Sequence, residues 1–403
     1  MKKILYFYPH KFGELTDGIH TRIVTILEYF KSREFEVDFV CLENATVKDP
    51  YVVKHNLVTN FYTVSEPAPR HQYKAKKYVN RVVKLVSKRW RRHQGKPELP
   101  DWVTPPLSDK IAELVTANNY HALLVTYQYW ASIALEFNKS NFATRKIIDP
   151  TDFLTLQQFY VNKELTYPDL GRFFGTELER LSYFDDVIYI SNDELFTFSG
   201  FLPKAKHHFI PQYFKRNVLY YPKANLHYDL LFVGSKNPYN VEGVIWFLED
   251  VLPLLNANIR IGIAGNVCTS ITKGYPNVSK LGFVENIDTL YQVSRCTICP
   301  LKRGSGMKIK VVESLSYGVP VIATSKGMDG FTNKNTGYGI MVENEPEGFA
   351  ETIHQLVSNE VFYQQQCIAA TQTFENTFSY EANFKKLDGI FNAATSTADR
   401  IQV

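Results

Sequence analysis

Short apolar runs and amphipathic segments alternate along almost the whole chain, and this alternation restricts the fold more than any other feature. In the first half, apolar runs of strand length are separated by helix-like segments, for example at about 19–31 and 175–184. Nearly continuous apolar strands between amphipathic helices are typical of a parallel sheet that helices cover on both faces. The strands expected in the first half are 3–8, 36–42, 60–64, 121–127, 145–149 and 186–191.

The alternation is interrupted once, by an irregular stretch with a proline at roughly 212–227, and then starts again. Two such runs predict an α/β protein with two Rossmann-like doubly wound domains, 1–211 and 228–378. Ligands of such folds bind beyond the carboxyl ends of the strands, so we expect a cleft between two facing domains. The strands expected in the second half are 228–234, 259–265, 279–284, 296–301, 320–325 and 338–344, and the helices are 240–255, 287–294, 308–318 and 345–357.

The size and composition of the chain agree with two folded domains. The chain has 403 residues, of which 45% are hydrophobic and 21% are charged, a normal balance for a globular protein. A last helix, at about 380–391 within the segment 379–393, is expected to return to the first domain.

The positive charge of the chain is concentrated in one segment. Between Arg70 and Lys96 there are eleven Lys or Arg and no Asp or Glu, although the net charge of the whole chain is only +4. Apolar residues recur in this segment at helical spacing, which predicts a basic amphipathic helix on an anionic membrane surface. The alternative is a solvated helix that packs its valines on the core. Nucleic acid is not expected as a partner. The apolar positions are Val79, Val82, Val83, Val86 and Trp90.

The cysteines and the N-terminus favour a reduced, cytoplasmic protein. Five cysteines are scattered, and Cys296 and Cys299 lie in an expected strand, where positions three apart point to opposite faces. A zinc site there is not expected. The first apolar run is too short for a signal peptide, and no apolar stretch reaches 18 residues. We expect a cytoplasmic location, with possible peripheral attachment to the inner face of the membrane.

The stretch RGSGMKIKVVESLSYGVPVIATSKG, residues 303–327, carries the best candidate site. Gly304 and Gly306 permit a tight turn from a strand into a helix, whose N-terminus suits a phosphate group. Lys308 at that end is unfavourable for the helix unless an anion lies nearby. Glu313 can accept hydrogen bonds from ribose hydroxyls. The alternative is a loop with a solvated Lys308 and a surface pair of Lys310 with Glu313.

These residues also carry a family resemblance. The C-terminal half resembles the retaining glycosyltransferases with the GT-B fold, in particular glycosyltransferase family 4, over most of residues 229–358. The family typically carries two glutamates eight positions apart in the stretch just described. The second matches Glu313, which in such enzymes binds the donor ribose, whereas Ser305 occupies the first position. The matching segments are LLFVGSKNPYNVEGVIWFLEDVLPLL, IAGN, KLGFVENIDTLYQVS, CTICPLKRGSGMKIKVVESLSYGVPVIATSKGMDGF and MVENEPEGFAETI.

The resemblance implies a donor site in the second half of the chain. It implies that Gly234, Ser235 and Lys236 contact the diphosphate of a nucleotide sugar, and that the backbone of Phe283 and Val284 contacts the base. A solvated turn is the alternative for Lys236.

The turn after the fourth strand of this half completes the implied donor site. By the same resemblance, Gly304, Ser305, Gly306 and Lys308 bind the diphosphate. In the first half, DGIH resembles the glycine loop of the family, so that Gly18 approaches the diphosphate from the opposite side.

The acceptor side and the chemistry are less constrained. Asp152 follows the strand 145–149 where related enzymes present a polar catalytic or acceptor-facing residue, and Asp149 is the other candidate. Either could instead cap the next helix. His20 and Arg22 either support the residues that contact the ligand or are solvated. Lys308 and helix N-termini can stabilise the departing diphosphate without metal, and no cluster has metal-ligand spacing, so no metal or cofactor is expected.

The resemblance therefore implies transfer of a sugar from a nucleotide diphosphate sugar to a glycan or lipid-linked acceptor. Retention of configuration and a role in surface polysaccharide or glycoconjugate synthesis are expected. Two alternatives stay open: a non-catalytic, nucleotide-sugar-binding partner subunit of a transferase, and a sugar-nucleotide epimerase on the same fold.

Overall fold

The described chain divides into two compact units. The first contains described residues up to 189 and residues 197–208, and the second contains residues 190–196 and 209–392. The predicted cleft and the predicted return of the last helix stay predictions. The computed structural model describes residues 2–10, 18–42, 55–65, 99–139, 144–162, 164–215, 226–304, 306–331 and 337–392.

Seven strands of the described residues form the sheet of the first unit, in the order β3-β2-β1-β4-β5-β6-β7. The pairings of β1 with β2 and β4 are parallel, and so are those of β2 with β3, β4 with β5 and β5 with β6. The order reverses between β1 and β4, as in doubly wound folds. The strands are β1 Lys3–Phe7, β2 Glu36–Leu42, β3 Asn60–Val64, β4 Ala122–Thr126, β5 Arg145–Asp149, β6 Asp186–Tyr189 and β7 Lys206–Phe209.

One expected helix in this unit begins earlier than predicted. The helix expected at 175–184 is α7, which starts at Tyr167, because Thr166 and Asp169 form a capping box at its N-terminus. β7 was not predicted, since its sequence KHHF has little apolar character. The α-helices that lie between these strands in the described chain are α1 Gly18–Ser32, α4 Pro105–Ala117, α5 Ile133–Lys139, α6 Leu154–Val161, α7 Tyr167–Leu181 and α8 Asn192–Ser199.

Six strands of the described residues form the second sheet, in the order β10-β9-β8-β11-β12-β13. All of its pairings are parallel. The order reverses between β8 and β11, which is the switch point where doubly wound folds bind ligands. The prediction of two parallel α/β domains is confirmed. The strands are β8 Tyr228–Val233, β9 Ile261–Ala264, β10 Val278–Gly282, β11 Ser294–Cys299, β12 Val321–Ala323 and β13 Ile340–Val342.

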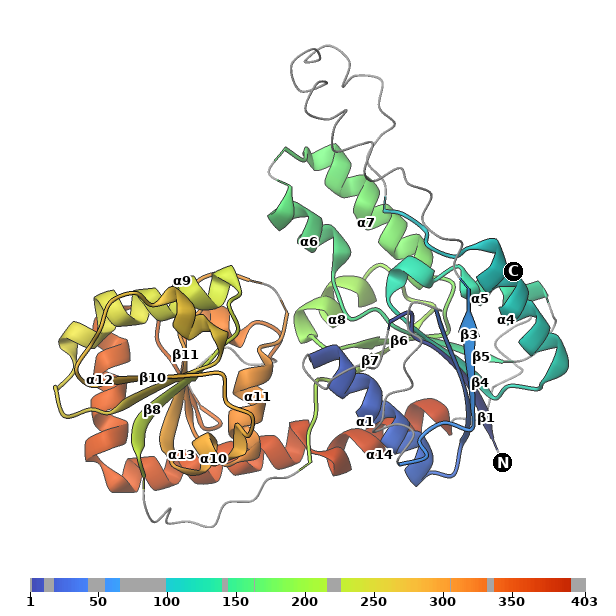
Figure 1. Ribbon diagram of the computed structural model, residues 1–403. Coiled ribbons are helices and arrows are strands. Elements are labelled where there is room, and N and C mark those ends of the chain that lie inside the picture. Colours follow the sequence, from blue (N-terminus) through green and yellow to red (C-terminus); the bar gives the residue numbers. More distant parts are fainter. Residues whose placement is uncertain are drawn as a thin grey trace. The chain divides into compact units, whose positions relative to one another are not determined.

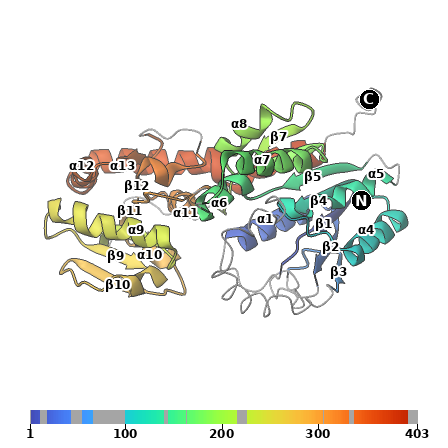
Figure 2. The same cartoon turned by 90° about the horizontal axis from the view of Figure 1, so that it is seen from above.

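Helices cover the second sheet, as Figures 1 and 2 show for α9 in yellow and α12 in red-orange. The helix expected at 240–255 is split into α9, a π-helical turn at Phe247–Val251 and a short 3-10 turn that contains Pro253, because proline has no N–H for the helical ladder. The helices are α9 Pro238–Trp246, α10 Asp288–Gln292, α11 Ile309–Ser316, α12 Pro346–Ser358, α13 Glu360–Thr373 and α14 Tyr380–Phe391.

Alternate residues of the central strands enter different cores. Leu230 and Phe232 of β8 pack in the cluster that contains residues of α9 and α12, whereas Leu231 packs with Tyr291 and Tyr317 on the other side. Both faces of the sheet are therefore buried, as the continuous apolar runs predicted.

The two cysteines of the CxxC sequence follow the same alternation. Cys296 belongs to the first of these cores and Cys299 to another cluster, which contains residues of α11. Both residues are buried and neither forms a disulfide bond within the described chain. Because they enter different cores, the prediction that they point to opposite faces is confirmed.

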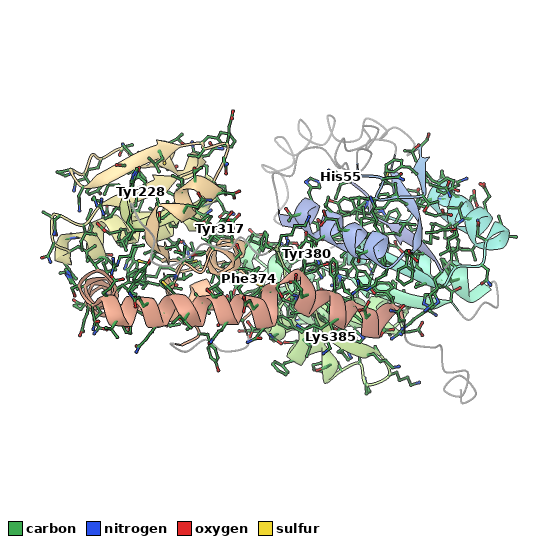
Figure 3. The ribbon with its side chains drawn as sticks, turned by 90° about the horizontal axis from the view of Figure 1, so that it is seen from below. His55, Tyr228, Tyr317, Phe374, Tyr380 and Lys385 are labelled. Atoms are coloured by element: carbon green, nitrogen blue, oxygen red, sulfur yellow. The ribbon has the colours of Figure 1, made fainter. Side chains whose placement is uncertain are left out.

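A helical run at the C-terminal end of the described chain covers α11. α13, a π-helical turn at Phe374–Phe378 and α14 follow one another, and Figure 3 labels Phe374 and Tyr380 along this run. Phe374 and Phe378 pack against the apolar side chains of α11. Among the described residues, no helix is both long and apolar enough to cross a membrane.

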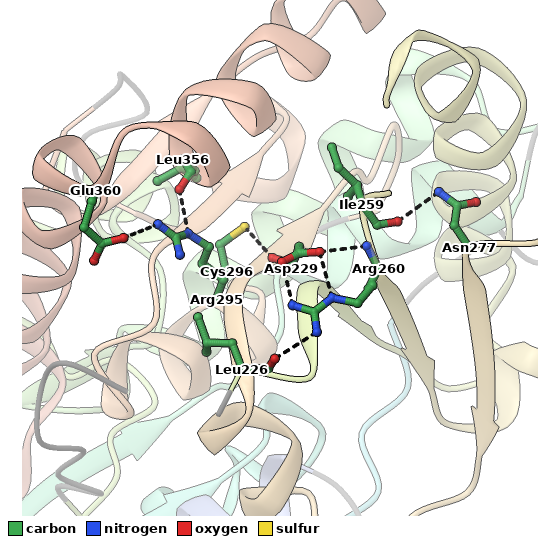
Figure 4. A network of polar contacts seen from close by, with 9 residues as sticks. All are labelled: Leu226, Asp229, Ile259, Arg260, Asn277, Arg295, Cys296, Leu356 and Glu360. Carbon is green, nitrogen blue, oxygen red and sulfur yellow. Dashed lines mark hydrogen bonds and ion pairs between the residues drawn. The ribbon is translucent and has the colours of Figure 1, made fainter. Parts of the chain in front are cut away.

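Ion pairs fix the amino edge of the second sheet (Figure 4). The guanidinium of Arg260 donates to Asp229, with Nη2 and Oδ1 3.1 Å apart, which ties the start of β8 to that of β9. Arg295, the second residue of β11, donates from Nη2 to Glu360 Oε2 at 2.5 Å and from Nε to the carbonyl of Leu356 at 2.7 Å. Each of these two arginines at the amino edge is therefore paired with a carboxylate.

A buried ion pair joins β5 to β6 in the first unit. Arg145 donates twice to Asp186, with Nη2 and Oδ1 2.5 Å apart, and His208 Nε2 donates to the same oxygen at 2.6 Å. Desolvation raises the pKa of the Asp186 carboxyl, but the hydrogen bonds from His208 and Arg145 outweigh it and hold that pKa below its usual range.

Replacing Asp186 with Asn should therefore lower the free energy of unfolding by about 3–5 kcal/mol, because Arg145 loses its buried carboxylate. Urea unfolding at pH 7 measures this loss, with the exposed Asp109→Asn of α4 as the control. The folded-state pKa is depressed, so the contribution is present above a pH of about 4 and is lost as the pH falls through the native pKa. Equal acid sensitivity of native protein and Asp186→Asn would contradict this account.

Candidate functional site

Two turns meet at the carboxyl edge of the second sheet, at its switch point. One follows β8 and leads into α9, and the other follows β11 and leads into α11. The first turn begins at Gly234, where a Cβ would lie 2.8 Å from the ring of Phe232. A Cβ on Gly265, after β9, would lie only 2.2 Å from the carbonyl oxygen of Gly234. The close approach of the two backbones requires glycine at 265, and the ring of Phe232 leaves no room for a Cβ at 234.

The second turn is built from glycines with backbone angles that other residues rarely adopt. Gly304 has φ +117° and Gly306 has φ +71°, which confirms that glycine is needed for this exit from the strand. Ser305, between them, lies outside the described residues. The N-cap of α11 is Lys308, and no side chain caps the helix there. The first N–H groups of α11 thus keep the positive end of the helix dipole at this edge.

Lys308 is not a solvated side chain, so that alternative is wrong. The residue is buried, with only 8% of its surface exposed. Its Nζ donates a hydrogen bond to the carbonyl oxygen of Gly306 at 2.7 Å. The ammonium group folds back onto the turn and lies 3.8 Å from the Cβ position of Gly304. Positive charge is therefore held against the turn by the backbone itself.

Glu313 lies one turn further along α11 and is held by a tyrosine. Tyr291 of α10 donates from its hydroxyl to Glu313 Oε2 at 2.8 Å. The ring of Tyr291 stacks on Tyr317 at 4.8 Å between centroids, and Tyr317 donates to Asp288. Desolvation raises the pKa of Glu313 above its ordinary value, and the hydrogen bond from Tyr291 offsets only part of that rise. The carboxylate is thus oriented at one oxygen before any ligand arrives.

Lys310 does not form the surface pair with Glu313 that the sequence suggested as an alternative. Its Nζ donates to Asn240 Oδ1 of α9 at 2.7 Å and lies 4.4 Å from the ring centroid of Phe232. Arg303 forms a further link to α9, since its Nε lies 2.9 Å from Glu242 Oε2. Neither Lys310 nor Asn240 was predicted as a site residue, because the spacing of polar residues does not reveal which of them points inward.

The remaining predicted donor residues lie along the same edge. Ser235 accepts hydrogen bonds from Asn240 at its carbonyl and its hydroxyl, and Lys236 is exposed. Phe283 follows β10, with its side chain 74% exposed, and Val284 comes next. The second unit therefore brings Gly234, Ser235, Gly304, Gly306 and Lys308 to one switch point, with Glu313 within the helix behind it.

Gly18 and Asp152, the other two predicted site residues, belong to the first unit. Gly18 is the first residue of α1. Asp152 is exposed after the end of β5, yet the surrounding protein desolvates its carboxyl enough to raise the pKa above its usual range. The residue before it, Thr151, has φ +64°, a strained conformation outside glycine.

The alternative that an aspartate caps the helix after β5 is wrong for both candidates. The N–H groups of Leu154 and Thr155 at the start of α6 donate to Glu177 of α7, each at 2.8 Å. Asp149 is fully buried and instead accepts from Arg22 Nε at 2.6 Å. Desolvation raises the pKa of Asp149, and Arg22 opposes that rise.

Arg22 is itself only 2% exposed, which excludes the solvated alternative for it. His20 is partly buried, and its ring meets that of Tyr8 edge-on at 6.3 Å between centroids. In the described part of the chain, no group of three or more His, Cys, Asp or Glu is arranged to hold a metal ion.

Solved structures share this fold over nearly the full chain. HepE from Anabaena, solved in complex with UDP, is 12% identical and has a TM-score of 0.68, covering 98% of this chain and 100% of its own. Sucrose-phosphate synthase from Thermosynechococcus elongatus is 11% identical with a TM-score of 0.66, covering 97% and 98%. TarM from S. aureus is 13% identical with a TM-score of 0.62, covering 98% and 100%. At these identities the likeness shows the fold alone.

Sequence comparison identifies the second unit more closely. An uncharacterized 44.6 kDa protein in the cps region of Klebsiella pneumoniae is 29% identical over 188 residues, or 43% of this chain. The match covers 47% of that protein, so it spans about half the length of the curated relative. Residues 227–359 match the family model described as Glycosyl transferases group 1. Residues 227–359 therefore match a glycosyltransferase domain of group 1, and the chain shares the GT-B fold of these solved structures.

Proposed function

We propose that the chain transfers a sugar from a nucleotide diphosphate sugar to a glycan or lipid-linked acceptor, with retention of configuration at the anomeric carbon. The observation that carries this proposal is the positive carboxyl edge of the second sheet. The glycine turn, Lys308 and the uncapped N-terminus of α11 follow β11 in the chain. Glu313 lies about one turn further along α11. A helix N-terminus suits a diphosphate, and a carboxylate can accept hydrogen bonds from ribose hydroxyls.

Relatives support the donor class. HepE was solved with UDP, with UDP and glucose, and with UDP-glucose, and TarM from S. aureus was solved with UDP among its ligands. The relative in the cps region supports a role in bacterial-type surface polysaccharide or glycoconjugate synthesis. We propose a nucleotide sugar as the donor on these grounds together with the site.

The proposed chemistry needs positive charge where the diphosphate departs. The bond between the anomeric carbon and the diphosphate oxygen breaks, and the acceptor oxygen forms the new bond and gives up its proton. Lys308 and the N–H groups of α11 are proposed to stabilise the negative charge on the leaving group, without a metal ion or cofactor. Asp152, whose pKa is raised by desolvation, is proposed to face the acceptor.

Direct assay of donor turnover tests the reaction itself. A thermal-shift screen of nucleotide sugars should find a donor, because a ligand at about 100 times its Kd adds about 2.7 kcal/mol to the stability. That donor should then be consumed only when an acceptor is present. Tight binding without transfer to a broad acceptor panel would favour a binding subunit, and a new sugar nucleotide from donor alone would favour an epimerase.

Alanine at Glu313 or Lys308 should each weaken donor binding or slow turnover by about tenfold or more, because charged hydrogen bonds to the ligand are lost. Both variants should stay folded, as circular dichroism can show. The exposed Glu249→Ala and Lys273→Ala serve as matched controls and should retain native kinetics. Full activity of both site variants with the true donor would refute the site.

Tyr291→Phe should reduce the preference of the protein for ribose over deoxyribose in the nucleotide. The substitution keeps the ring that stacks on Tyr317 but removes the hydroxyl that orients Glu313. Binding of ribo- and 2′-deoxyribonucleoside diphosphates is compared by calorimetry for native and variant protein. An unchanged ratio of the two affinities would show that Glu313 does not contact the sugar through this arrangement.

The membrane partner is a separate proposal, because residues 70–96 lie outside the described residues. We propose that this basic segment holds the enzyme at the inner face of the membrane, beside a lipid-linked acceptor. Each cation near an anionic surface contributes about 1 kcal/mol, and salt screens the attraction over about 8–10 Å.

The native protein should therefore bind anionic vesicles at low salt and should bind neutral vesicles weakly. Replacing the basic residues with Gln should release it, which vesicle sedimentation measures. If the native protein stays in the supernatant with anionic vesicles at low salt, the segment is a solvated helix instead. The replaced residues are Arg81, Lys84, Lys88, Arg89, Arg91 and Arg92.

A further inference from the structure

Lys310 is a desolvated cation at the carboxyl edge of the second sheet. It lies in the first turn of α11, on the side that faces α9 and the end of β8. Its ammonium group contacts a neutral amide, that of Asn240, and the ring face of Phe232. Among the described residues, no carboxylate forms an ion pair with its ammonium group. Burying a charged lysine without a carboxylate partner costs free energy, because the ammonium group loses its hydration.

The position is electrostatically unfavourable in three ways. Desolvation is the largest effect and, with Lys308 nearby, lowers the pKa of Lys310 to about 8. The positive end of the helix dipole opposes a cation in the first turn of α11. The other ionisable groups that face Lys310 are the Cys299 thiol of β11, whose own pKa burial raises, and the Glu313 carboxyl of α11. These two favour the charged form but do not restore the ordinary pKa.

Lys310 is linked to the turn after β8 through a single side chain. An ammonium group only donates hydrogen bonds, so the amide oxygen of Asn240 must face Lys310. The amide nitrogen of Asn240 then points to Ser235 and donates to its carbonyl oxygen at 3.2 Å and to its hydroxyl at 3.3 Å. One charge thereby fixes the orientation of an amide, and the amide fixes the turn.

We propose that Lys310 is a positioning residue of the donor site, which holds the turn after β8 against the start of α11 through Asn240. It thereby makes one rigid anion site out of two turns that are about 70 residues apart in the chain. This inference rests on the proposed function, because the anion is taken to be the diphosphate of the donor. Lys310 adds positive charge to this site, together with Lys308 and the glycine turn.

The charge of Lys310 gives the proposal a signature in pH. A bound anion favours the ammonium form, so binding should raise the pKa of Lys310 from about 8 and take up a proton when the pH lies above that value. The affinity of the native protein should fall as the pH rises from 7 to 9, because the free protein loses the cation over that interval. An arginine at this position stays charged throughout and should remove the dependence.

The experiment is a calorimetric titration of UDP, GDP and ADP into full-length native protein, followed by titration of the best-bound of the three into variants. Lys310→Gln should weaken binding about tenfold or more at pH 7 without lowering the Tm. Lys310→Arg should bind within about threefold of native at pH 7 and equally at pH 9. Lys386→Gln is the matched control, since Lys386 is also desolvated and also lies over a phenylalanine ring.

A double-mutant cycle tests the path through the amide. Asn240→Ala should weaken binding as Lys310→Gln does, and the two losses should not add, because both break the same link. Additive losses would overturn the positioning role. Native affinity in Lys310→Gln, or the same pH dependence in native protein and Lys310→Arg, would overturn the inference while leaving the proposed function intact. If native protein binds none of the three nucleotides, the proposed donor class fails and this inference fails with it.

Discussion

The parallel pairing of β8 with β11 is the constraint on which the second unit depends. Cys296 lies opposite Leu230 and Thr297 opposite Leu231, so both strands end at the same edge of the sheet. The helices that follow them, α9 and α11, therefore begin next to each other and direct their first N–H groups to that edge. Two helix N-termini and two lysines then concentrate positive charge in a small volume. The site follows from strand order rather than from any single motif.

The two edges of this sheet use charge in opposite ways. At the amino edge, Arg260 and Arg295 face Asp229 and Glu360, and the resulting pairs tie strands and helices together. At the carboxyl edge, Lys308 donates to a backbone carbonyl and Lys310 to an amide, and neither contact cancels a charge. The first arrangement needs no ligand to be satisfied. The second gains free energy when an anion arrives, which is what a binding site requires.

The strands and their arrangement in two parallel sheets could be predicted from the sequence, because buried parallel strands leave long apolar runs that few other structures produce. The glycine turn was also predictable, since Gly304 and Gly306 stand where a strand ends and only glycine adopts such angles easily. The hydrogen-bond partners of the buried polar residues could not be predicted from the sequence. Lys310 and Glu313 are three residues apart and of opposite charge, which suggests an ion pair, yet tertiary contacts with Asn240 and Tyr291 prevail. Sequence spacing describes one helix, whereas these contacts come from its neighbours.

The cap on α6 has a consequence for the residue that precedes it. The N-terminus of this helix is held by Glu177, which lies in α7, more than twenty residues further along the chain. The same carboxylate accepts from Gln128, whose amide also donates to the carbonyl oxygen of Asp152. A shift of α7 along its axis would therefore pull on the backbone at Asp152 with no intervening flexible loop. The first unit thus contains a short chain of hydrogen bonds through which the position of α7 is transmitted to the backbone of Asp152.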